Sequence, residues 1–60
     1  MVRIPNKSTA ITWLDTILDC TTNGDARLKA KMLLDSDLEK AENLQRVKEL
    51  VTQEYHVDVE

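Results

Sequence analysis

The sequence has very little of what holds most small folds together. Its 60 residues include one cysteine, one glycine, one proline and no phenylalanine, and Trp13 and Tyr55 are its only aromatic residues. A single cysteine excludes an internal disulfide. The scarcity of glycine and proline argues against a sandwich or barrel, which needs many turns. The composition favours one small helical domain over residues 1–60.

The shortness of the chain limits how well it can bury its own core. Chains below about 70 to 80 residues usually need a disulfide, a metal ion or a partner for stability. No Cys/His spacing in the sequence suggests a zinc site, so we expect neither a metal nor a cofactor. By elimination, the expected stabilising partner is another protein or a second copy of the chain, as in a homodimer.

The charge is acidic overall and uneven along the chain. Net charge is −3, and residues 36–60 hold seven of the eleven acidic residues. A net acidic chain gains no general attraction to phosphate, so nucleic acid is not the expected partner. No apolar run approaches the roughly 20 residues of a membrane span, and the N-terminus does not resemble a signal peptide. With an unpaired cysteine, these features predict a cytoplasmic protein without membrane contact.

The first helix is indicated by apolar residues at helical spacing. Ser8 or Thr9 is expected to cap its amino end, because either hydroxyl can accept a hydrogen bond from the first turn. Asn23-Gly24 is expected to end it with a left-handed cap. Its apolar stripe consists of Ile11, Leu14, Ile17 and Leu18.

Two further helices are expected, with a break or a continuous helix between them. Asp25 would cap a helix that continues through Leu34. Ser36 and Glu39 have the spacing of a capping box, which favours a fresh start and a last helix over about 37–54. Glu42 would pair with Arg46 one turn later. The stripe of this last helix consists of Leu38, Ala41, Leu44, Val47, Leu50 and Val51.

Both ends of the chain alternate apolar and polar residues outside the helices. Residues 2–4 and 57–59 are each too short to persist as a strand alone, so we expect them to pair with one another, with frayed termini as the alternative. Arg3 and Asp58 would then share a face. An odd number of helices carries the ends to opposite poles, which favours pairing between chains. The predicted fold is all-α: a helical hairpin or three short helices, with a minimal strand pair from the termini.

The residues with catalytic chemistry form no convincing site. Cys20 lies near the C-terminus of a predicted helix, whose dipole disfavours a thiolate there, so it is interpreted as a small buried apolar residue. His56, Asp58 and Glu60 share one face of the tail, but a short tail fixes no metal site, and a solvated face is expected. We predict no catalytic residue and no enzymatic activity.

Amphipathic helices in so short a chain predict a protein-binding face. We expect a small regulatory or inhibitory protein that binds a larger protein stoichiometrically. The alternative is a small dimeric DNA-associated transcription regulator that uses Arg27 and Lys31. The candidate interface residues are Ile11, Trp13, Leu14, Ile17, Leu18, Met32, Leu38, Leu44, Val47, Val51 and Tyr55.

Overall fold

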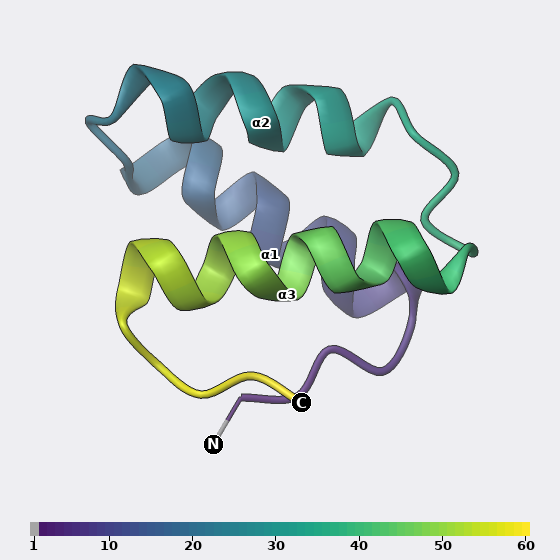
Figure 1. The fold of residues 1–60 in the computed structure, drawn as a ribbon. Helices are drawn as coiled ribbons and strands as arrows, with labels where there is room; N and C mark the ends of the chain where they lie inside the picture. Colours follow the sequence, from purple (N-terminus) through teal and green to yellow (C-terminus); the bar gives the residue numbers. More distant parts are fainter. Residues whose placement is uncertain (1) are drawn as a thin grey trace.

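The chain folds into three short helices, as a computed structural model describing residues 2–60 shows. They are α1 (Lys7–Cys20), α2 (Gly24–Leu34) and α3 (Ala41–Tyr55). α2 and α3 run side by side in opposite directions, and α1 lies behind this pair (Figure 1). The predicted all-α fold is confirmed in its three-helix form, and none of the described helices is long and apolar enough to cross a membrane.

The core is formed by the apolar stripes of all three helices. Within residues 2–60, no polar or charged side chain is buried. Ala26 and Ala30 are the residues that α2 buries beside Leu33, and such small side chains leave little separation between α2 and its neighbours. The buried residues are Ile4, Ala10, Leu14, Ile17, Ala26, Ala30, Leu33, Leu38, Val47, Leu50 and Val51.

The cap of α1 lies two or three residues before the predicted one. The side chain of Asn6 accepts a hydrogen bond from the backbone N–H of Thr9, at 3.1 Å, so the helix begins at Lys7. Ser8 and Thr9 are therefore inside the helix, and the predicted caps are wrong. Asn and Ser are equally good caps, and Asn6 is the first of the three along the chain.

Asn23 caps the amino end of α2 and does not end α1. Its Oδ1 accepts from the N–H of Asp25 at 3.0 Å, and Gly24 has a negative φ as the first residue of α2. The predicted left-handed cap and the predicted role of Asp25 are both wrong. α1 ends at Cys20, so only three residues separate it from Gly24, the first residue of α2, and the Asn23 side chain caps that second helix.

The break after α2 is confirmed, but the fresh start at Ser36 is wrong. The Ser36 hydroxyl donates to the carbonyl oxygen of Leu33 at 2.6 Å and so closes the end of α2. Asp37 accepts from the N–H of Glu39, and α3 begins only at Ala41. Leu38 is buried from this loop, which anchors the connection to the core.

The two tails pair with one another as predicted, within a single chain. Val2 and Val59 form a parallel bridge. The N–H of Val2 donates to the carbonyl of Asp58 at 3.0 Å, and the N–H of Glu60 donates to the carbonyl of Val2 at 2.9 Å. Ile4 becomes fully buried in the core (0% exposed), so the tails close the base of the bundle.

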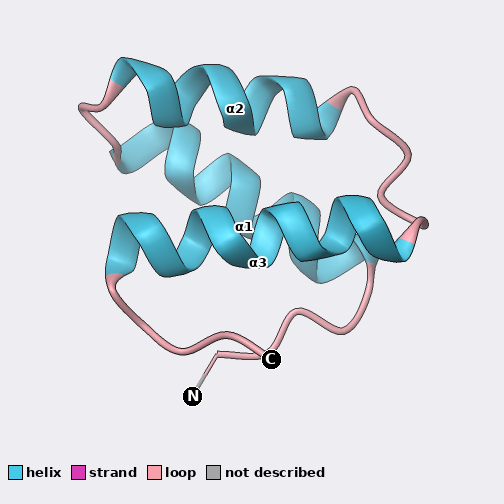
Figure 2. Cartoon of the chain, in the orientation of Figure 1, coloured by secondary structure: helices cyan, strands magenta, loops and turns pink. Residues whose placement is uncertain are grey.

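The expectation that three helices would favour pairing between chains is wrong. Extended backbone rises about 3.3 Å per residue, so each five-residue tail can span about 16 Å. The 15 residues of α3 measure only about 22 Å. Two tails that run toward each other therefore meet beneath the bundle (Figure 2). The parallel register also places Arg3 near Glu60, at 3.7 Å, instead of near Asp58.

Candidate docking surface

The predicted interface residues divide by burial into three groups. Five of them lie in the core of the chain itself, where a partner cannot touch them: Leu14, Ile17, Leu38, Val47 and Val51. Four are half-buried against that core: Ile11, Trp13, Leu18 and Leu44. Only Met32 and Tyr55 count as exposed, at 64% and 36%. Apolar periodicity identifies the buried side of a helix without telling whether the chain or a partner covers it.

Met32 and Tyr55 do not share a surface. Tyr55 ends α3 and packs edge-on against Trp13 of α1, with ring centroids 5.6 Å apart and planes at 61°. Partial burial, with smaller effects of Cys20 and Glu54, raises the pKa of the Tyr55 hydroxyl, so the ring stays neutral at pH 7. Met32 lies near the carboxyl end of α2, at the opposite end of the bundle (Figure 1).

Cys20 is exposed, which contradicts its interpretation as a buried apolar residue. It is the last residue of α1, beyond the stripe that buries Leu14 and Ile17. Within the described part of the chain, no group of three His, Cys, Asp or Glu side chains is placed to hold a metal ion.

Among residues 2–60, the outer side of α2 carries the most exposed large apolar side chains. Leu28 is 59% exposed and lies one turn before Met32, on the side away from Ala26 and Ala30. Sequence reasoning left Leu28 out of the interface. The sequence signal that could have identified Leu28 was its four-residue spacing from Met32, which places both residues beside the buried stripe. We call Leu28, Met32 and the two exposed cations between them, Lys29 and Lys31, the α2 face.

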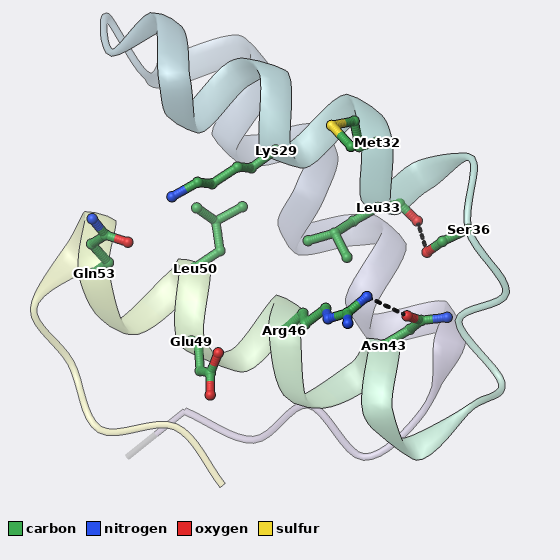
Figure 3. Close-up of a pocket in the computed structure, with 9 residues that line it drawn as sticks. All are labelled: Lys29, Met32, Leu33, Ser36, Asn43, Arg46, Glu49, Leu50 and Gln53. Atoms are coloured by element: carbon green, nitrogen blue, oxygen red, sulfur yellow. Dashed lines mark hydrogen bonds between the residues drawn. The ribbon is translucent and has the colours of Figure 1, made fainter.

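A groove runs between α2 and α3, next to the α2 face. It has a volume of about 440 Å³. Its apolar floor is made by Leu33 and Leu50, and Met32 stands at its α2 edge (Figure 3). Lys29 reaches over Leu50 from α2. We call this the α2–α3 groove.

Two cations and one carboxylate border the α2–α3 groove. Lys29 comes from α2, whereas Arg46 and Glu49 come from α3. Arg46 pairs with Glu42 at 2.9 Å, as predicted, and donates to Asn43 at 3.4 Å. The guanidinium is therefore held in place along the α3 edge.

α2 is basic in an acidic protein. It carries Arg27, Lys29 and Lys31 against Asp25 alone, while the chain as a whole has a net charge of −3. Among residues 2–60, none of these three cations lies within salt-bridge distance of a carboxylate. Their charge is therefore directed to solvent along the same helix that exposes Leu28 and Met32.

Comparison with protein-family models, with curated proteins and with solved structures finds no match to this chain.

Proposed function

We propose that this chain is a small non-enzymatic binding protein, which regulates or inhibits a larger protein by docking on it stoichiometrically. The observation that carries the proposal is the exposure of Leu28 and Met32 one turn apart, beside an apolar groove. Every other large aliphatic side chain described is buried or half-buried against the core.

Burial of these two side chains supplies a substantial driving force for docking. Covering a Leu or Met side chain completely is worth about 1.5 to 3 kcal/mol. Met also adapts its shape to a partner surface, because its unbranched side chain rotates freely. Leu28 and Met32 therefore form an apolar centre, and the surrounding cations form a polar rim.

A different protein fits the α2 face better than a second copy does. A two-fold contact places the same patch of both subunits together. Here it would bring Lys29 and Lys31 against the same two cations of the other subunit, and Asp25 is the only carboxylate of that helix. Like charges in contact oppose association. We therefore favour a heterologous partner over a homodimer on this face.

Site-specific photo-cross-linking in the native cell tests the proposal. A cross-linking residue replaces Met32, and a control replaces Asp15, which is exposed on α1. We expect one defined adduct from position 32 and none from position 15. The purified adduct partner should then titrate to saturation at a fixed molar ratio. The same adducts from both positions, or a partner that does not saturate, would contradict stoichiometric docking through α2.

The second candidate function is DNA binding by a dimer, favoured by the three unpaired cations of α2. Neutralisation of each phosphate contributes about −0.9 to the slope of log affinity against log salt. A dimer that used Arg27 and Lys31 of both chains, the two cations that share a face of α2, would give a slope of about −3.6. Titration of a DNA duplex at several salt concentrations tests it, and a slope near zero would exclude it.

A further inference from the structure

We infer that the α2–α3 groove receives an acidic amphipathic helix of the partner protein; this inference rests on the docking function proposed above. The groove lies between two antiparallel helices, and α1 packs behind them (Figures 1 and 3). The front of the pair is therefore open to a further helix. An amphipathic helix in an apolar groove is a common mode of peptide recognition.

The dimensions of α2 set the length of that helix. Its 11 residues measure about 16 Å, so a partner helix of about three turns covers it. Leu33 and Leu50 form the floor, and Met32 stands at the edge. The partner therefore needs apolar side chains at a spacing of three and four residues, which keeps them on one face.

The charges bordering the groove select an acidic partner. Lys29 and Arg46 flank the floor from opposite helices, whereas Arg27 and Lys31, two residues before and after Lys29, lie on the other side of α2. Glu49, on α3, is the only carboxylate that lines the groove. The complementary helix carries acidic residues along its α2 side and a neutral or basic residue opposite Glu49.

A protein helix satisfies this surface better than nucleic acid does. Phosphates offer no apolar surface to cover Leu28 and Met32. The seven acidic residues among 36–60 also oppose a polyanion that extends beyond α2. A short acidic helix supplies both apolar and anionic groups, and it contacts only the part of α3 that lines the groove, where Glu49 is the one carboxylate.

Two synthetic peptides test the inference against the complete, isotope-labelled chain. One is a three-turn amphipathic helix with leucines on one face and glutamates beside them. The other has every glutamate replaced by lysine. We expect the acidic peptide to bind at least tenfold more tightly and to shift the amide resonances of Lys29, Leu33 and Leu50. Equal or tighter binding of the basic peptide would overturn the inference.

Two matched charge reversals separate the local effect from the net charge. Lys29→Glu changes the groove, whereas Lys7→Glu makes the same change at the start of α1. Lys29→Glu should lower the affinity for the acidic peptide at least tenfold, and Lys7→Glu less than threefold. Equal losses, or displacement of the peptide by a DNA duplex at equal concentration, would overturn the inference. So would a failure of both peptides to bind, which leaves the cross-linking result at position 32 unaffected.

Discussion

Apolar side chains are buried at the base of the bundle but exposed on the outer side of α2. At the base, the paired tails bury Ile4 and half-bury Val2, Val57 and Val59 against the core. On α2, Leu28 and Met32 remain exposed although the core is already closed beneath them. The paired tails thus cover the base of the core with residues from both ends of the chain. The proposed docking surface therefore does not overlap the residues that close the base, and we expect each to be changed without the other.

Truncation of a leucine on each surface should give the largest contrast. Leu14→Ala is expected to lower the free energy of unfolding by about 2 to 5 kcal/mol, because its side chain is fully buried. Leu28→Ala should change it by less than about 0.5 kcal/mol, as is usual for exposed positions. Leu44→Ala should fall between them, since Leu44 is half-buried. Urea unfolding followed by circular dichroism measures all three, and equal midpoints for Leu14→Ala and Leu28→Ala would contradict the comparison.

Truncating the side chain of Ile4 tests whether the paired tails at the base contribute to the stability of the fold. Ile4→Ala should destabilise by about 2 to 4 kcal/mol and Ile4→Val by about 1 kcal/mol, in proportion to the volume removed from the core. The thermal midpoint of the unaltered chain should not depend on protein concentration, because the tails pair within one chain. A midpoint that rises with concentration would indicate that a second copy supplies the missing contact.

The turn from α3 into the tail is strained at one residue. His56 has φ 54° and ψ 42°, a left-handed conformation that costs an L-residue about 1 kcal/mol or more. His56→Gly should therefore stabilise the fold by about 0.5 to 1 kcal/mol, after the larger entropy of glycine in the unfolded state is subtracted. Thr52→Gly, inside α3, is the control and should destabilise by about 0.3 to 0.5 kcal/mol, the difference between the helix propensities of Thr and Gly. Thermal unfolding measures both, and a loss of stability in His56→Gly would show that the His56 side chain makes a net favourable contribution.

The sequence allowed the helices and the tail pairing to be predicted because both depend on strong periodicities. Apolar residues recur with a period of about 3.6 around Leu14 and Val47, and with a period of 2 around Val57. Both periods can be recognised within each segment alone. The helix ends were missed because several cap residues compete within a few positions. Asn6 precedes Ser8, and Asn23 precedes Asp25, with similar intrinsic preferences. The choice depends on where the previous segment ends.

The candidate docking surface was only partly predictable for a different reason. The sequence places Met32 beside a buried stripe, and Met32 was therefore included in the predicted interface. Leu28 holds the equivalent position one turn earlier but was left out. The α2–α3 groove was missed altogether, because Lys29 and Arg46 come from different helices and share a site only after folding. Charge along one helix can be read from sequence, whereas charge across a groove depends on packing.

The smallest expected effect tests the register of the tail pair. Arg3 lies 3.7 Å from Glu60, and both side chains are largely exposed, so a double-mutant cycle should give a coupling below about 0.5 kcal/mol. The same cycle between Arg3 and Asp58 should give no measurable coupling, because a parallel bridge between Val2 and Val59 places the next residue of each tail side by side. Molar salt should remove the Arg3–Glu60 coupling by screening. A larger coupling to Asp58 than to Glu60 would instead indicate a shifted or antiparallel register, and the tails would then close the base differently.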